Sequence, residues 1–195
     1  SRGGIVATSQ PLATAAGLEM LARGGNAADA AVAAGAALNV TEPSSTGIGG
    51  DMFALYFTAA TGQVTSLNGS GRSPAALSLN RLMQEGITDS LHPFHAHTIT
   101  VPGASAGWFD LIEKHGSLPM SEILAPAIRL AEEGFPVSPI TAHSWAMGVD
   151  RQLGSALNGH ELTIDGRAPR AGEIFHNPNL GRTLKMVAKG GREGF

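Results

Sequence analysis

The stretch ATSQPLATAAGLEMLARGGNAADAAVAAGAALNVTEPSSTGIGGDMF (Ala7–Phe53) decides the fold, because it holds two helix signals, a loop and the start of a strand. Ser9 is a candidate N-cap, and Pro11 falls in the first turn, where its missing N–H costs no hydrogen bond. Gly24 and Gly25 predict the end of this first helix. Apolar residues at helical spacing support it, namely Leu12, Ala16 and Met20.

A second helix is predicted from Ala27 to about Asn39, with Asn26 as its N-cap. Asp29 is the only charged residue in this helix, and nearly every other side chain is a methyl group or smaller. Because it lacks a broad polar face, we expect it to be buried on almost all sides.

A strand and a hairpin follow the second helix. Thr41–Asp51 is rich in turn residues, and the apolar, partly aromatic run Met52–Thr58 predicts a buried strand. Gly62 marks a turn into the alternating segment Val64–Asn68. These two strands are therefore expected to pair as a hairpin.

The rest of the chain is predicted to be mainly helical. The expected helices are Leu77–Glu85, Ala104–His115, Met120–Glu133, Thr141–Leu153 and Asn179–Gly191. The segment HTITV predicts a further strand that ends at Val101, and Gly154–Pro178 is expected to be a loop. Two long strands among many helices predict an α+β fold with helices covering a sheet, in a single domain over residues 1–195.

Composition excludes several classes of protein. With 195 residues, 43% of them hydrophobic and 15% charged, the chain can bury a core, which excludes a disordered or fibrous protein. A net charge of −3 without a basic cluster argues against nucleic acid as a partner. The absence of cysteine excludes disulfides and a cysteine nucleophile.

The sequence also bears on location. No run approaches the roughly 20 apolar residues of a membrane span, and no signal peptide is recognised at the N-terminus. We therefore expect no membrane partner and a soluble chain. A cytoplasmic location is favoured over a periplasmic or secreted one.

Two glycine-containing segments are candidate site elements. GIGGD (Gly47–Asp51) is either a tight turn before a strand or a backbone surface that contacts substrate. Asp51 would need a nearby cation to act as a site carboxylate, and Arg72 is the nearest candidate by sequence. GSGRSP (Gly69–Pro74) places Arg72 between small residues, where its guanidinium can meet a carboxylate or lie on the surface of a turn.

Two other chemistries remain as alternatives. No nucleophile elbow is predicted, and no HExxH helix and no GxxxxGK[ST] phosphate loop occurs. His92, His95 and His97 are spaced so that they could converge on a metal ion, as in a metal-dependent hydrolase. Ser1 could be an N-terminal nucleophile whose own amine is the base, but no strand is predicted to begin there, which favours trimming.

Four segments in order carry a resemblance to a known family. Ala7–Phe53 resembles the opening of the large subunit of gamma-glutamyltranspeptidases, which belong to the N-terminal nucleophile hydrolase superfamily. The later landmarks are TVPGASAGW (Thr100–Trp108), LAPAIRLAEEGFPVS (Leu124–Ser138) and NLGRTLKMVAKGGREGF (Asn179–Phe195). The resemblance covers essentially the whole chain.

The resemblance implies part of an αββα sandwich made jointly by two subunits cut from one precursor. The nucleophile of the family is a threonine that begins the small subunit, so no catalytic residue is expected in this chain and the small subunit is its expected partner. The threonine's free amine is the general base, and the acyl group passes to water or to an amino acid. No cofactor and no metal are implied.

The family pattern also implies a substrate-binding arginine, and here the sequence departs from it. Aligning on Pro74 puts Ser70 where the arginine that grips the substrate α-carboxylate stands, and Arg72 lies two positions later. Either Arg72 does the same work from a shifted backbone, or this pocket does not recognise a glutamyl carboxylate. Asp51 replaces the glycine usual in glutathione-cleaving members. The predicted substrate-binding residues are Arg72, Ser70, Asn68, Asp51 and Gly50.

These departures resemble the branch that includes cephalosporin acylase-like enzymes and small-amide hydrolases. The expected activity is cleavage of a gamma-glutamyl or related small-molecule amide, with hydrolysis favoured over transfer. A non-enzymatic helical binding module is the alternative of a different class.

Overall fold

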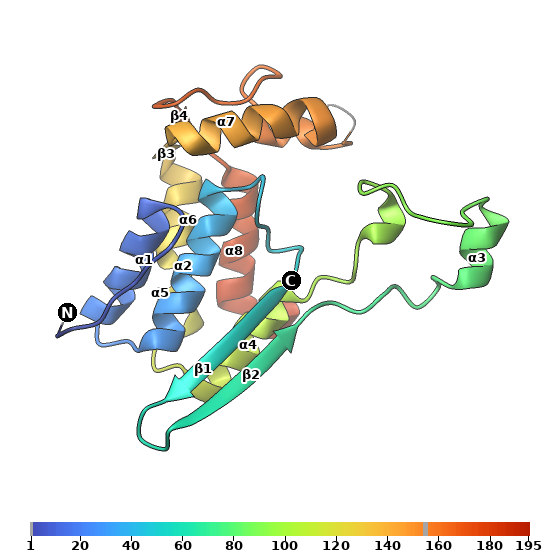
Figure 1. The fold of residues 1–195 in the computed structure, drawn as a ribbon. Coiled ribbons are helices and arrows are strands. Elements are labelled where there is room, and N and C mark those ends of the chain that lie inside the picture. The colour runs from blue at the N-terminus through green and yellow to red at the C-terminus, as the bar shows by residue number, and fades with distance from the viewer. Residues whose placement is uncertain (1, 154–155) are drawn as a thin grey trace. The chain divides into compact units, whose positions relative to one another are not determined.

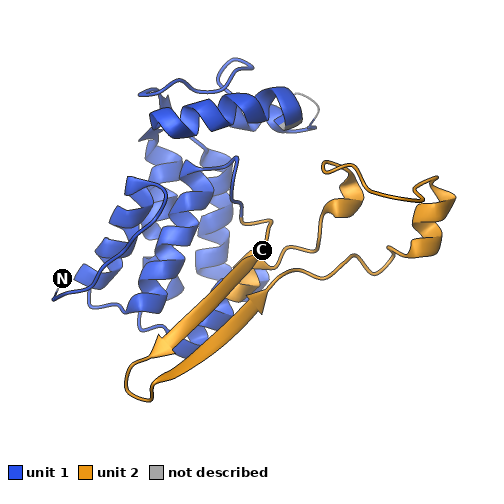
Figure 2. Cartoon of the chain, viewed as in Figure 1, with its two compact units in different colours: residues 1–47, 108–195 blue, residues 48–107 orange. Residues whose placement is uncertain are grey.

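The computed structural model describes residues 2–153 and 156–195, so the candidate nucleophile Ser1 and two residues of the predicted loop, Gly154 and Ser155, lie outside the described residues. The chain is α+β, as predicted. It divides into two compact units, Ser1–Gly47 with Trp108–Phe195 (unit 1) and Ile48–Gly107 (unit 2), shown in Figure 2. This division does not test the single domain, which stays a prediction.

Unit 1 is helical, and Figure 1 shows α1, α2, α6 and α8 packed side by side with α7 across one end of them. The helices of this unit are α1 (Pro11–Ala22), α2 (Ala27–Thr41), α5 (Met120–Ile123), α6 (Ala125–Glu133), α7 (Pro139–Gly148), α8 (Pro178–Gly190) and most of α4 (Ala104–His115). None of the described helices has the length and apolar content needed to cross a lipid bilayer.

The start of α1 differs from its prediction. Gln10 is the N-cap, and its side-chain oxygen accepts hydrogen bonds from the backbone N–H groups of Leu12 and Ala13. Ser9 instead donates its hydroxyl to Glu42, at 2.8 Å. The longer glutamine side chain can fold back over the first turn, so the general preference for serine at this position was misleading here.

The second helix matches its prediction closely, although it runs two residues further. Asn26 and Asp29 form a reciprocal capping box at its N-terminus, and most of its side chains are buried. The Asp29 carboxylate is itself fully buried and also accepts hydrogen bonds from the backbone N–H groups of Ser117 and Leu118, at 3.0 to 3.2 Å. One carboxylate therefore joins the start of α2 to the segment after α4.

The other helices show where local signals were insufficient. The single helix predicted over Met120–Glu133 breaks at Leu124 into α5 and α6, because Pro126 has no N–H to continue the helical ladder. The helix predicted over Thr141–Leu153 ends as α-helix at Gly148, and a π turn follows over Val149–Leu153.

The predicted loop Gly154–Pro178 contains regular structure. A 3-10 turn occupies Gly159–Leu162, and β4 (Ile174–Phe175) pairs antiparallel with β3 (Phe135–Pro136). Trp145 fixes this end of the unit, since its ring lies 4.7 Å from that of Phe175, centroid to centroid, and its indole N–H donates to Leu162 O at 2.9 Å. The last helix, α8, is confirmed, and a short 3-10 turn follows it over Gly191–Gly194.

Unit 2 is built on the predicted hairpin. Strands β1 (Met52–Thr58) and β2 (Gln63–Gly69) pair antiparallel. The short helix predicted over Leu77–Glu85 is present as α3 (Leu79–Gln84), and Ser78 is its N-cap. The first turn of α4 also belongs to this unit.

Two predictions in unit 2 were wrong. The segment HTITV is not a strand, because Ala96–Thr98 forms a 3-10 turn in which the Thr98 hydroxyl donates to His95 O at 2.7 Å. Strand β1 is not buried within this chain, since its outward side chains Phe53, Leu55 and Phe57 are 67%, 80% and 61% exposed.

Candidate substrate-binding site

The residues predicted to bind substrate lie at one end of the β1–β2 hairpin. In the antiparallel register Met52 pairs with Gly69 and Phe53 pairs with Asn68. The segment that enters β1 and the segment that leaves β2 are therefore neighbours. The predicted residues grouped in this way are Gly50, Asp51, Asn68, Ser70 and Arg72.

A third segment closes this end of the hairpin. Gly50 O accepts hydrogen bonds from the backbone N–H groups of Gly103 and Ala104, at 3.0 and 2.9 Å. The backbone approach is close, because a Cβ placed on Gly103 would overlap Gly69 O. Gly103 is therefore required where three backbone segments converge.

Asp51 points into the loop that carries Arg72. Its Oδ1 accepts hydrogen bonds from the backbone N–H of Gly71 at 3.2 Å and from the Thr100 hydroxyl at 3.4 Å. The sequence suggested Arg72 as its cation, but among the described residues Asp51 forms no ion pair with Arg72. The carboxylate therefore holds the loop backbone, and the arginine side chain stays separate from it.

Arg72 is exposed and available. Its carbonyl accepts the Val101 N–H at 2.9 Å, which fixes the backbone. Within residues 2–153 and 156–195 its guanidinium has no carboxylate partner. A guanidinium fixed at its base and unpaired at its tip can make a bidentate contact with a carboxylate from outside the described residues.

Asn68 and Ser70 form a local turn beside this arginine. The Asn68 Oδ1 accepts the Ser70 N–H at 3.0 Å, a side-chain turn that Asn favours. This bond occupies the oxygen of the amide. Its NH2 group can therefore still donate to a ligand.

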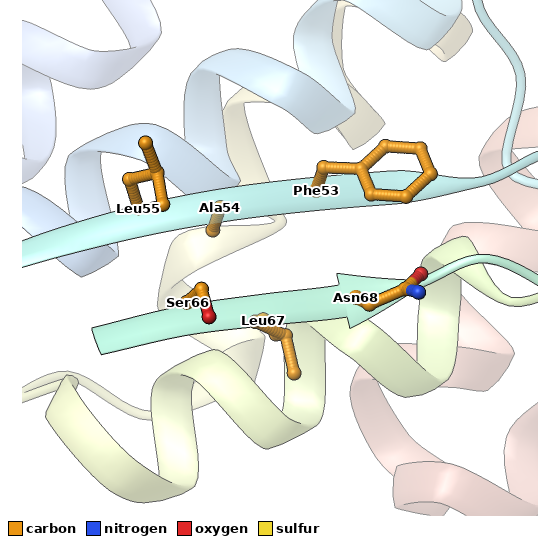
Figure 3. A pocket seen from close by; sticks show the side chains of 6 residues that line it. All are labelled: Phe53, Ala54, Leu55, Ser66, Leu67 and Asn68. Atoms are coloured by element: carbon orange, nitrogen blue, oxygen red, sulfur yellow. The ribbon is translucent and has the colours of Figure 1, made fainter.

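A shallow apolar pocket lies on the adjoining face of the hairpin. Its volume is about 330 Å³. Figure 3 shows two of its lining residues, Phe53 and Leu55, on β1 and a third, Asn68, at the end of β2. The other lining residues are Ala54, Ser66 and Leu67. Asn68 is the lining residue nearest Arg72 in sequence, so this apolar face begins where the predicted substrate-binding residues end.

Sequence reasoning missed two features near this site. Thr100 lies 49 positions from Asp51 in sequence, so no local pattern indicates their hydrogen bond. Gly103–Gly107, GASAG, also has the Gly-x-Ser-x-Gly spacing of a nucleophile elbow, so sequence reasoning was wrong to treat this spacing as absent. The structure does not place Ser105 on an elbow, since it is 3% exposed in the first turn of α4 and no strand leads into that turn within the described chain.

The histidine cluster forms a different arrangement from a three-histidine metal site. His97 Nε2 lies 2.6 Å from Glu85 Oε2, and Arg81 Nε donates to Glu85 Oε1 at 2.9 Å. The hydrogen bonds from Arg81 and then His97 lower the pKa of Glu85. Across the described part of the chain no three imidazole or carboxylate groups are placed to hold a metal ion, so this geometry does not support the metal hypothesis.

Comparison with known proteins agrees with the fold. The family model described as gamma-glutamyltranspeptidase matches residues 13–195. The chain therefore belongs to the gamma-glutamyltranspeptidase family, as the resemblance implied.

Three relatives show the range of this similarity. The chain is 32% identical over 197 residues to the glutathione hydrolase proenzyme of Bacillus subtilis (strain 168), covering 100% of this chain and 33% of the relative. Among solved structures, gamma-glutamyltranspeptidase from Helicobacter pylori matches with a TM-score of 0.91 and 30% identity over 100% of this chain and 56% of that chain.

Cephalosporin acylase from Bacillus halodurans matches with a TM-score of 0.89 and 41% identity over 97% of this chain and 38% of that chain. The chain spans about a third of the length of the curated relatives it matches.

Proposed function

We propose that this chain is the N-terminal part of the large subunit of an amidohydrolase or acyltransferase that cleaves gamma-glutamyl or related amide bonds. The observation that carries the proposal is the match of the family model across residues 13–195. The relative from Bacillus subtilis is named a proenzyme, which fits a precursor that is processed. In this proposal the acyl-enzyme forms on the threonine that begins the small subunit, and this chain supplies one wall of the site.

Arg72 is proposed to bind the carboxylate of the substrate's acyl group. Its exposed guanidinium, without a carboxylate partner in the described chain, is the group suited to this task. Asn68 would donate from its amide NH2, and Ser70 from its hydroxyl, while Gly50 would line the site with its backbone.

The exposed face of the hairpin is proposed to join a larger sheet. Phe53, Leu55, Phe57 and Val64 each expose more than half of their surface, which is unusual for four large apolar residues on one hairpin. Because the chain spans about a third of its curated relatives, the remainder of the precursor is the proposed cover. The complete protein would then form the αββα sandwich, with the small subunit as the partner.

A cephalosporin acylase-like activity is the second candidate, and one observation favours it. The chain is 41% identical to the Bacillus halodurans cephalosporin acylase, compared with 30% to the Helicobacter pylori transpeptidase, over nearly the same share of this chain. The substrate would then be a small molecule with an acyl side chain in amide linkage. A carboxylate on that side chain would still meet Arg72.

The test is a set of variants in the full-length precursor. Arg72→Ala is expected to raise the KM for gamma-glutamyl para-nitroanilide by about 10-fold to 150-fold, since a charge-assisted hydrogen-bonded contact contributes about 1.5 to 3 kcal/mol. Arg72→Lys should recover only part of this, because lysine lacks the planar fork. Self-cleavage, followed by gel electrophoresis and N-terminal sequencing of the smaller fragment, should be unchanged.

Arg81→Ala is the matched control, because Arg81 is an exposed arginine of the same unit that pairs with Glu85. It should leave the KM unchanged. Normal kinetics for Arg72→Ala would remove Arg72 from the site.

A precursor that neither cleaves itself nor hydrolyses gamma-glutamyl, glutaryl or simple acyl anilides would instead favour the non-enzymatic binding module.

A further inference from the structure

Two departures from the family pattern meet in one hydrogen bond. The sequence has a carboxylate at Asp51 and an arginine at Arg72, two positions after the expected place. In the structure the Asp51 Oδ1 accepts the N–H of Gly71, the residue directly before Arg72, at 3.2 Å. The carboxylate is thus bonded to the backbone that sets where the arginine begins.

The loop that carries Arg72 is held from the other side as well. Val101 N–H donates to Arg72 O at 2.9 Å, and a Cβ on Gly71 would overlap the carbonyl oxygen of Val101. Thr100 donates its hydroxyl to the same Asp51 Oδ1 at 3.4 Å. Asp51 therefore sits between the arginine loop and the segment that packs against it, and links the two.

A direct contact between Asp51 and substrate fits this arrangement poorly. A substrate carboxylate bound by Arg72 would be repelled by a second carboxylate at the same place. The Oδ1 atom already accepts two hydrogen bonds that connect protein segments. The carboxylate also forms no ion pair with Arg72 in the described chain, so the charge of the guanidinium remains available to a ligand.

We propose that Asp51 is a positioning residue for Arg72: it fixes the Ser70–Arg72 loop against Thr100, and so sets the point from which the guanidinium reaches the substrate carboxylate. This rests on the proposed function in one respect, that Arg72 binds that carboxylate. It predicts that specificity for carboxylate-bearing acyl groups depends on a residue that does not touch the substrate.

The kinetic test compares substrates that differ only in the acyl end group. In the full-length precursor, Asp51→Ala should raise the KM for gamma-glutamyl and glutaryl para-nitroanilides by about 5-fold to 20-fold, the effect of one or two weakened hydrogen bonds. The KM for butyryl para-nitroanilide, which has no carboxylate, should change by less than about twofold. Asp51→Asn should restore most of the loss, because the amide oxygen still accepts from Gly71 and Thr100.

A double variant separates positioning from an independent role. If Asp51 acts through Arg72, adding Asp51→Ala to Arg72→Ala should raise the KM no further than Arg72→Ala alone. A KM that falls in Asp51→Ala would show that Asp51 faces the substrate carboxylate and would overturn the proposal. An equal rise for all three anilides would show general damage to the site and would also overturn it.

Hydrogen exchange tests the positioning without turnover. The Gly71 amide should exchange about 10 times faster in Asp51→Ala than in the parent protein, and Thr100→Val should speed it less, since the Gly71 bond itself remains. An unchanged Gly71 exchange rate overturns the positioning role whatever the kinetics show. If Arg72→Ala affects all anilides alike while Gly71 exchange still depends on Asp51, the proposed function fails and the anchoring of the loop stands.

Discussion

Asp29 of unit 1 and Asp51 of unit 2 use the same chemistry in different surroundings. Each accepts hydrogen bonds from backbone far away in sequence, 88 or 89 positions for Asp29 and 20 for Asp51. Asp29 is fully buried and Asp51 is exposed. Because an unmet donor is costly only where water cannot replace its partner, the first carboxylate stabilises the fold and the second can only bias a loop.

The two units differ in the same way in their apolar surfaces. Most of the small side chains of α2 are buried, so this helix already has its apolar surface covered within the chain. In β1 the large side chains alternate toward solvent. Substitutions at the buried positions of unit 1 should therefore lower the free energy of unfolding of this chain by itself. Substitutions on the exposed face of the hairpin should lower it only in a longer protein that covers this face.

The largest expected effect is at Asp29. Asp29→Ala leaves the N–H groups of Asn26, Ser117 and Leu118 without their acceptor. Since each of these three partly buried donors costs about 1 kcal/mol or more when it loses its acceptor, we expect a loss of about 3 kcal/mol in the free energy of unfolding. Denaturant unfolding followed by circular dichroism measures it.

Two controls sharpen that experiment. Asp29→Asn keeps one acceptor oxygen and should lose distinctly less stability than Asp29→Ala. Glu133→Ala removes an exposed carboxylate at the end of α6 and should change the free energy of unfolding by less than about 0.5 kcal/mol. Equal losses of stability in Asp29→Ala and Glu133→Ala would show that the hydrogen bonds of the Asp29 carboxylate do not stabilise unit 1.

Glu173, a half-buried carboxylate of unit 1, is expected to give an effect of intermediate size that depends on pH. The bidentate hydrogen bond from Arg167, with a further one from the Arg170 N–H, lowers the pKa of Glu173 to about 2. An ordinary glutamate in the unfolded chain titrates near pH ~4.3. Because the folded pKa is the lower one, the ionised Glu173 stabilises the fold fully above pH ~4.3, and this is lost as the pH falls through about 2.

The matched variant is Arg167→Gln. In it the Glu173 carboxyl, followed by carbon NMR, should titrate closer to pH ~4.3 than in the parent protein. The stability difference between parent and variant should be constant above pH ~4.3 and shrink toward pH ~2. A Glu173 midpoint that does not move in Arg167→Gln would show that the arginine does not cause the low pKa.

Local chemistry made part of this structure predictable. Asn26 with Asp29 three residues later is a cap that needs only neighbouring residues, and α2 begins where that pattern places it. The hairpin followed in the same way from alternating residues around Gly62. The misplaced cap at Ser9 and the helix break before Pro126 were also local, but they depended on which of two adjacent signals prevailed.

The remainder depends on contacts that no local pattern encodes. HTITV alternates like a strand, but a strand needs a neighbour, and Ile99 and Val101 remain exposed without one in the described chain. At the candidate site the sequence identified the residues but not their connections. The bond from Thr100 to Asp51 spans 49 positions, and only the folded backbone brings these residues together.

The smallest expected effect in this chain is at Leu55, which is 80% exposed on β1. Leu55→Ser should change the free energy of unfolding of the 195-residue chain by less than about 0.5 kcal/mol, whereas Leu184→Ala, at a fully buried position of α8, should cost about 2 to 5 kcal/mol.

In the full-length precursor the difference in stability loss between Leu55→Ser and Leu184→Ala should become smaller. A covered Leu55 loses apolar burial worth about 1.5 to 3 kcal/mol when it becomes serine. Unfolding of both variants in both lengths of protein measures this. If Leu55→Ser stays neutral in the precursor, the hairpin face is exposed in the complete protein as well, and the contrast between the two units would then be intrinsic to the fold and independent of assembly.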